Sequence, residues 1–375
     1  MKKLVFIIGV FVLGLILLAQ ELQHETGVIN IEVPVRVFTK GKFVEELTLK
    51  DFELYEEGVL QKIEALYLIK KNVIEKEETE MDTKQASRLF SPETSRSFVL
   101  MFEMMDYFPE IRELLDYFFE HVISSGDSLF VITPLKTYTY EKEFLDETPR
   151  EESVKQVNKR LRKDIISASL EYKSMISDLE WLSNISNPLK AEAADRIYEQ
   201  IRDYRQFDDK KLIKFKDQLK EIEGQKYVFL IYQKQLIPIP PEFASGREKQ
   251  IFFNAKKIKQ SFSDSSINVN FIFLTKTRQS GSGITRTSPT KMVMDDLSAK
   301  MYGSLREVAE ATGGITDSSA NIAASFQQAA VSSENYYLLY YTPKDYKADG
   351  EFKNIHVKIK GKNYRVTHRA GYIAN

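Results

Sequence analysis

The chain has 375 residues, of which 43% are hydrophobic and 29% are charged, with 53 Lys and Arg against 54 Asp and Glu. This composition indicates folded domains rather than disorder, and the balanced charge excludes the global basic footprint of a nucleic-acid-binding protein. Because the sequence contains no cysteine, disulfides and a lipid-modified amino-terminal cysteine are excluded. Stability must come from packing, and the length is sufficient for two domains at roughly 100–200 residues each.

The first 20 residues have the pattern of an export signal. Lys2 and Lys3 precede an uncharged apolar run from Leu4 to Ala19, which is the order of a secretory signal peptide. Since this run is shorter than the roughly 20 apolar residues of a spanning helix, a cleaved signal peptide over 1–19 is favoured over an uncleaved anchor. We therefore expect an exported protein that is periplasmic, in the cell envelope or secreted. Contact with a membrane is expected only through an uncleaved amino-terminal segment.

A small β module is predicted over residues 27–70. Apolar residues alternate from Val28 to Phe38, and Asp51–Gly58 reads as a strand that runs into a glycine turn; both patterns are typical of half-buried strands. Residues 71–95 are charged and polar with little periodicity, so we expect a solvated linker there.

From residue 96 to residue 343 predicted strands alternate with predicted helices. The strands are expected at 97–103, 129–133, 226–232, 267–274 and 336–341, and the helices at 109–124, 246–262 and 295–312. Such alternation predicts an α/β domain with a mostly parallel sheet covered by helices. Apolar residues at helical spacing predict an insertion of two long helices over about 149–224, joined near 186–188.

The carboxyl-terminal segment 344–375 is predicted to form a β-hairpin. Alternating apolar residues at Ile355, Val357 and Ile359 are followed by a turn at Gly361. Because an isolated hairpin is only marginally stable in water, we expect this one to pack on the amino-terminal β module.

Several phrases of the sequence, taken in order, resemble the von Willebrand factor A domain and, more narrowly, bacterial exported proteins related to it. The phrases are Leu49–Ile63, Leu305–Gly314, Tyr336–Pro343, Gly350–Val357 and Arg369–Tyr372. The resemblance covers most of residues 28–373, apart from the linker and the helical insertion. It implies a Rossmann-like fold, with a divalent cation held at the end of the first sheet strand by Asp-x-Ser-x-Ser and by residues of two further loops.

The sequence departs from that cation motif. Glu103, Met105 and Tyr107 stand where the family has Asp, Ser and Ser, and a thioether is a poor ligand for magnesium or calcium. We therefore expect a degenerate site without metal or other cofactor. The alternative is a non-standard magnesium or calcium site that uses Glu103 and Asp106, although hard cations take about six oxygen ligands.

Loops at the carboxyl ends of parallel strands are where such sheets usually bind ligands. Three segments are expected to form one recognition face there: the loop 103–108, the apolar turn 236–241 and the basic loop 275–291. The partner-binding candidates are Glu103, Asp106, Leu236, Ile237, Ile239, Lys276, Arg278, Arg286 and Lys291.

No pattern in the sequence favours catalysis. The four histidines lie far apart, and Gly281-Ser282-Gly283 lacks the Gly-x-Ser-x-Gly spacing of a nucleophile elbow. The sequence therefore predicts an exported, non-catalytic protein-protein interaction module that works without metal, with a protein partner and no nucleic acid. The alternative function is a metal-dependent adhesion protein.

Overall fold

A computed structural model describes residues 29–79, 90–186, 188–205, 209–234, 236–239, 260–262, 266–277 and 293–374. The predicted signal peptide at 1–19 lies outside these ranges. Within them, no helix combines the length and the apolar character needed to cross a membrane.

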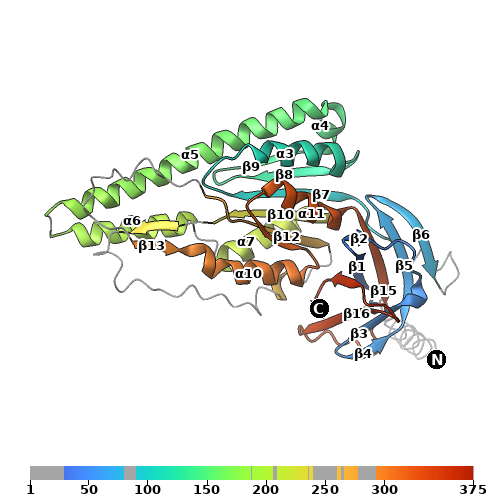
Figure 1. The fold of residues 1–375 in the computed structure, drawn as a ribbon. Helices are drawn as coiled ribbons and strands as arrows, with labels where there is room; N and C mark the ends of the chain where they lie inside the picture. The colour runs from blue at the N-terminus through green and yellow to red at the C-terminus, as the bar shows by residue number, and fades with distance from the viewer. Residues whose placement is uncertain are drawn as a thin grey trace, which may run out of the picture.

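The described elements form two antiparallel sheets that pack on each other, a third sheet covered by helices, and a separate two-stranded sheet (Figure 1). The first sheet has the order β17-β1-β15-β5-β6, with β2 beside β1, and the second has the order β18-β16-β3-β4. Their strands are β1 (Ile31–Thr39), β2 (Lys42–Phe43), β3 (Phe52–Glu56), β4 (Val59–Gln61), β5 (Ile63–Lys70), β6 (Val73–Thr79), β15 (Asn335–Tyr341), β16 (Phe352–Ile359), β17 (Arg365–His368) and β18 (Gly371–Ile373). We call these two sheets the β sandwich, because one apolar core takes side chains from both, among them Val35, Leu54, Tyr337 and Val357.

The third sheet, here called the central sheet, has the order β14-β12-β10-β7-β8-β9. Its strands are β7 (Arg96–Glu103), β8 (Ser128–Ile132), β9 (Thr137–Tyr140), β10 (Gln225–Gln233), β12 (Ile267–Leu274) and β14 (Thr316–Ser319). The pairs from β14 to β8 are parallel, and β9 is antiparallel to β8.

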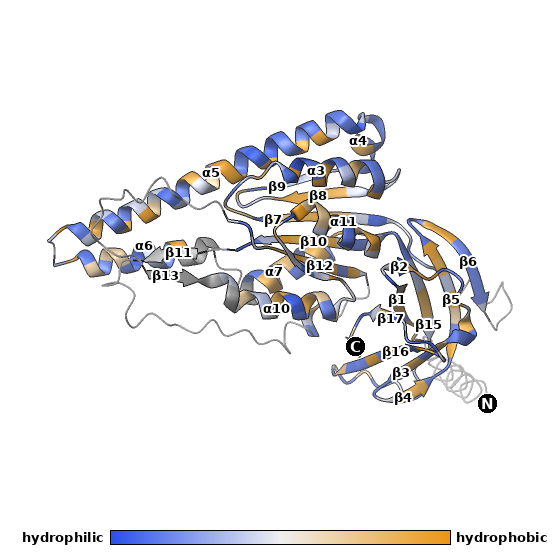
Figure 2. Ribbon diagram, in the orientation of Figure 1, coloured by the Kyte–Doolittle hydropathy of each residue, from blue (hydrophilic) through white to orange (hydrophobic). Residues whose placement is uncertain are grey.

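Helices cover both faces of the central sheet (Figure 1). One face packs on α3 (Glu110–Tyr117), α5 (Arg150–Asn184) and α11 (Ile322–Ala330), and the other on α7 (Asp209–Lys220) and α10 (Leu297–Ala311). Cover on both faces explains why β7 and β10 consist almost wholly of buried side chains. Figure 2 shows these central strands as largely hydrophobic, whereas α5 is hydrophilic along most of its length.

The predicted fold class, a von Willebrand A-like and mostly parallel sheet, is wrong. The two sheets of the β sandwich are antiparallel, and β11 (Leu236–Ile239) pairs antiparallel with β13 (Val293–Asp296). Parallel pairing among the described strands is confined to part of the central sheet. The protein is a mixed α/β chain with mostly antiparallel sheets.

Strand β15 accounts for much of this error. Its apolar run predicted a strand of the parallel sheet, but it pairs antiparallel with β1 and β5 in the β sandwich. An apolar run reports burial on both faces and does not encode strand direction. On the second face of β15, Phe90 packs on the ring of Tyr340 at a centroid distance of 4.9 Å, and Tyr67 of the neighbouring strand β5 lies beside that ring at 5.7 Å.

The ends of the β sandwich also differ from expectation. The first part of the expected linker forms β6, whose charged and mostly exposed side chains are common on an edge strand because charge discourages further pairing. In the expected hairpin, β16 pairs with β3 while β17 pairs with β1. The carboxyl-terminal strands thus join the two sheets of the β sandwich.

The helical segment contains three helices rather than two. Helix α5 is followed by α6 (Lys190–Arg205) and then by α7. Figure 1 shows α5 running across the central sheet and beyond it, where it packs on α6. Residues 246–259 of another predicted helix lie outside the described residues. The remaining described helices are α4 (Lys142–Glu147) and the short turns η1 (Leu49–Asp51), η2 (Phe118–Val122) and η3 (Val331–Ser333).

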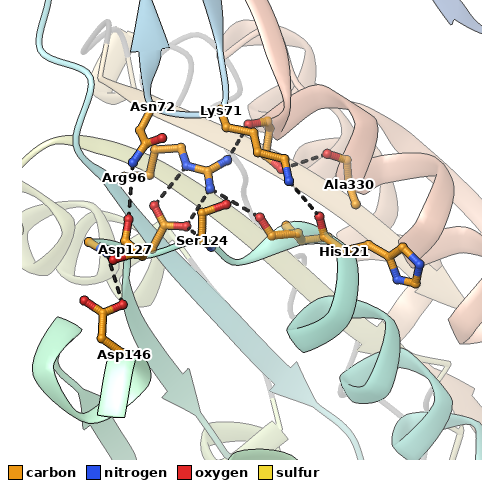
Figure 3. A network of polar contacts seen from close by, with 12 residues as sticks. Lys71, Asn72, Arg96, His121, Ser124, Asp127, Asp146 and Ala330 are labelled. Carbon is orange, nitrogen blue, oxygen red and sulfur yellow. Dashed lines mark hydrogen bonds and ion pairs between the residues drawn. The ribbon is translucent and has the colours of Figure 1, made fainter. Parts of the chain in front are cut away.

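A buried ion pair between Arg96 and Asp127 lies at the amino ends of the parallel strands β7 and β8 (Figure 3). The Arg96 guanidinium donates to Asp127 at 3.0 and 2.5 Å, and to the carbonyl oxygens of Val122 and Ser333 at 3.2 Å each. Both charged side chains are at most 1% exposed. Burial raises the pKa of the Asp127 carboxyl, and the hydrogen bonds from Arg96 oppose that shift. The ion pair holds the amino end of β7 in place, and because β7 is a single strand, it also helps to position Glu103 at the carboxyl end.

Candidate functional site

The candidate site lies where β7, β10 and β12 end. These parallel strands are in register, so that Glu103 lies opposite Tyr232, and Gln233 lies opposite Leu274. Their carboxyl ends therefore meet at one edge of the central sheet, which is where ligands bind in open α/β sheets. We call this region the carboxyl edge.

Gln233 is the central side chain of the carboxyl edge. It is 1% exposed, and its Oε1 accepts hydrogen bonds from the backbone N–H groups of Met105 and Asp106 at 2.8 and 3.0 Å. Its Nε2 donates to Asp106 Oδ2 at 2.9 Å and to the Lys276 carbonyl oxygen at 3.2 Å. A glutamine amide has two donors and two acceptor lone pairs, so all four positions are used. Gln233 thus ties the β7–α3 loop to the segment after β12.

An ion pair makes a second tie between the same two segments. Lys276 Nζ lies 2.5 Å from Glu110 Oε1 and 5.0 Å from the centre of the Phe108 ring. The hydrogen bond from Lys276 lowers the pKa of Glu110. Because the two side chains are 40% and 24% exposed, solvent screens this pair, and its main effect is to orient Lys276 over the loop.

The loop also contacts α5. The Tyr107 hydroxyl donates to Asn158 Oδ1 at 2.7 Å, and the Arg162 guanidinium lies 5.5 Å from the centre of the Tyr107 ring. The carboxyl edge is therefore continuous with the surface of α5 beside it.

The structure brings together three of the sequence-predicted partner-binding residues: Glu103, Asp106 and Lys276. Leu236, Ile237 and Ile239 lie in β11, of which only the backbone is described, and Arg278, Arg286 and Lys291 lie outside the described residues. Sequence reasoning missed Gln233 as the organising side chain. The available signal was a polar residue at the end of the apolar run Tyr227–Tyr232.

Two hollows lie elsewhere on the surface. One, of about 560 Å³, is bounded by β8, β9 and α7 and carries Glu141, Glu221 and Glu223. The other, of about 360 Å³, lies between α3 and α5. None of the residues that line the first hollow belongs to the carboxyl edge.

The side chains at the carboxyl edge form hydrogen bonds and an ion pair. Within the described ranges, no group of three or more His, Asp or Glu side chains is arranged to hold a metal ion. Comparison of the chain with protein-family models, curated proteins and solved structures finds no match.

Proposed function

We propose that the protein is an exported, non-catalytic protein-binding module whose recognition face is the carboxyl edge, and that this binding needs no metal. One observation carries the proposal. The buried amide of Gln233 holds the β7–α3 loop and the segment after β12 in a single arrangement through four hydrogen bonds. A recognition surface that is ordered before binding loses less conformational entropy when a partner docks.

The same amide supports independence from metal. A Gln233 N–H group points at Asp106 Oδ2 from 2.9 Å, and a cation bound to that oxygen would have to displace this donor. The four hydrogen bonds of the Gln233 amide are here called the clamp. The backbone N–H of Met105, in the middle of the loop, donates one of them, and the Met105 thioether is a poor ligand for hard cations. Glu103 and Asp106 are the two carboxylates of the loop 103–108, and calcium takes six or more oxygen ligands.

The rival hypothesis is a divalent-metal-dependent adhesion protein in which Glu103 and Asp106 hold the ion. The two hypotheses differ in what isothermal titration with magnesium, manganese and calcium should show. We expect no saturable heat from the wild type. Saturable binding that disappears in the variant Glu103→Ala/Asp106→Ala would refute metal independence and support the rival.

A second experiment addresses the recognition face. The immobilised protein is used to capture partners from an envelope extract of the source organism, with and without EDTA. We expect a captured protein whose yield falls at least about tenfold, or 1.4 kcal/mol, in the variant Glu103→Ala/Asp106→Ala and is unchanged by EDTA. The matched control is Asp345→Ala/Asp349→Ala, in the segment after β15. Equal capture by both variants would contradict the proposal.

A further inference from the structure

The hollow between α3 and α5 is lined by positive charge. Five cationic side chains border its volume of about 360 Å³, together with Asn158 and Ile166. The five cations are Arg112, Lys155, Lys159, Arg162 and Lys163. We call this surface the basic groove.

Helical spacing explains how the sequence forms the groove. On α5 the lysines 155, 159 and 163 follow one another at intervals of four residues, which places them on one face of the helix. Val154, Val157, Leu161 and Ile165 occupy the buried face that packs on the central sheet. The lysines therefore point away from the core and are exposed.

The groove has few internal counter-ions. Arg112 pairs with Asp116 at 2.9 Å, and Lys155 lies 3.8 Å from Glu152. Among the described residues, no carboxylate lies within ion-pair distance of Lys159, Arg162 or Lys163. Arg162 lies over the Tyr107 ring. Like charges four residues apart destabilise a helix by about 0.2–0.5 kcal/mol per pair, so the stripe of Lys155, Lys159 and Lys163 weakens α5 by its own repulsion.

Arg160, on the same helix, shows the contrast. Its guanidinium lies over the rings of Tyr138 and Tyr140, at 5.1 and 5.4 Å from their centres. That cation is used in packing against β9, whereas Lys159 and Lys163 contribute charge to the groove alone. The charge of the groove therefore points to a ligand outside the fold.

We propose that the basic groove binds an acidic segment of a partner protein, with carboxylates facing Lys155, Lys159 and Lys163 and an apolar side chain against Ile166. Charge complementarity determines the sign of the ligand. Ile166 and Leu170, which continue the lysine stripe along α5, are 44% and 62% exposed, and they favour a ligand that carries apolar groups as well as charge. A polypeptide combines the two, whereas nucleic acid presents phosphates with little aliphatic surface. The groove adjoins the carboxyl edge, because Tyr107 of the loop contacts Asn158 and Arg162, but Lys155, Lys159, Lys163 and Ile166 all lie on α5. The proposal therefore stands whether or not the loop 103–108 binds a partner.

The test measures the fluorescence anisotropy of a short labelled peptide of glutamates with interspersed leucines, titrated with the full protein at physiological salt. We expect saturable binding that weakens as salt is added, and no binding of the same peptide with glutamine in place of glutamate. The variant Lys159→Glu/Lys163→Glu should lose at least about tenfold in affinity, or 1.4 kcal/mol. Both positions are exposed, so this variant should fold, and Lys159→Gln/Lys163→Gln gives a milder version of the same loss.

The matched control is Lys344→Glu/Lys347→Glu, which changes the net charge equally on an exposed loop of the β sandwich and should keep the wild-type affinity. The variant Glu103→Ala/Asp106→Ala should also keep it, which separates this proposal from that for the carboxyl edge. Equal loss in both charge-reversal variants would overturn the proposal. Tighter binding of a DNA duplex or of anionic phospholipid vesicles through Lys159 and Lys163 would also overturn it, in favour of another class of ligand.

Discussion

Replacement of Gln233 by leucine tests the clamp at the carboxyl edge. Leucine has a similar volume, so the change removes hydrogen bonds with little effect on packing. Three of the four lost bonds involve backbone groups, each worth about 0.5–1.5 kcal/mol net, and the bond to the Asp106 carboxylate is worth about 1.5–3 kcal/mol. Because Met105 and Asp106 are only partly buried, water can replace some of these bonds. We expect the free energy of unfolding to fall by about 2–4 kcal/mol.

Two measurements check this prediction. Urea unfolding gives the overall loss, and amide hydrogen exchange at residues 105 and 106 reports whether the loop has become free to open. The matched control is Gln61→Leu, which removes another buried amide whose hydrogen bonds are longer, at 3.3 and 3.4 Å, and lie in the β sandwich. The control should leave exchange at 105 and 106 unchanged. Unchanged exchange in Gln233→Leu would refute the clamp.

Three further predictions concern stability. The variant Asp127→Asn leaves the Arg96 guanidinium buried without a counter-ion, which should cost about 3–5 kcal/mol in urea unfolding; additive losses in a double-mutant cycle between Asp127 and Arg96 would contradict this pairing. Burial lowers the pKa of His368, whose Nε2 accepts a hydrogen bond of 3.2 Å from a β16 backbone N–H. The free energy of unfolding of the wild type should therefore decrease as the pH falls from 6.5, the ordinary histidine pKa, to the lower pKa of His368 in the folded protein. Above pH 6.5 this histidine should cause no change of stability with pH, and the variant His368→Asn should lack the decrease below it. A Cβ at Gly314 would overlap a carbonyl oxygen of β12, so Gly314→Ala should lower the free energy of unfolding by about 3 kcal/mol, and wild-type thermal stability would refute the overlap.

The sequence predicted local structure better than strand direction. The apolar runs of β7, β10 and β12 indicated buried strands, and those strands are buried and parallel to one another. The run of β15 looks the same in the sequence, yet it pairs antiparallel with β1 and β5. Direction depends on which strands become neighbours, and that depends on contacts between residues about 300 positions apart, such as Tyr337 with Leu47 (290 positions).

The candidate site was predicted only in part, for a related reason. Loop position in the sequence was enough to nominate Glu103, Asp106 and Lys276. The clamp itself depends on Gln233, which meets Asp106 only because β10 pairs with β7 in a particular register. The basic groove, too, is only partly predictable from the sequence. The spacing of the lysines on α5 is visible there, whereas the position of Arg112 beside them depends on how α3 packs on α5.

Site-specific photo-crosslinking shows directly whether a partner protein binds at the carboxyl edge. A benzoylphenylalanine is placed at position 107, where Tyr107 lies on the loop, and in a separate variant at position 55, where Tyr55 lies on the β sandwich. Each protein is irradiated in an envelope extract of the source organism, with and without EDTA. We expect a discrete crosslinked protein at position 107 that persists in EDTA and is absent at position 55. Loss of that product in EDTA, or equal products at both positions, would contradict a metal-independent recognition face.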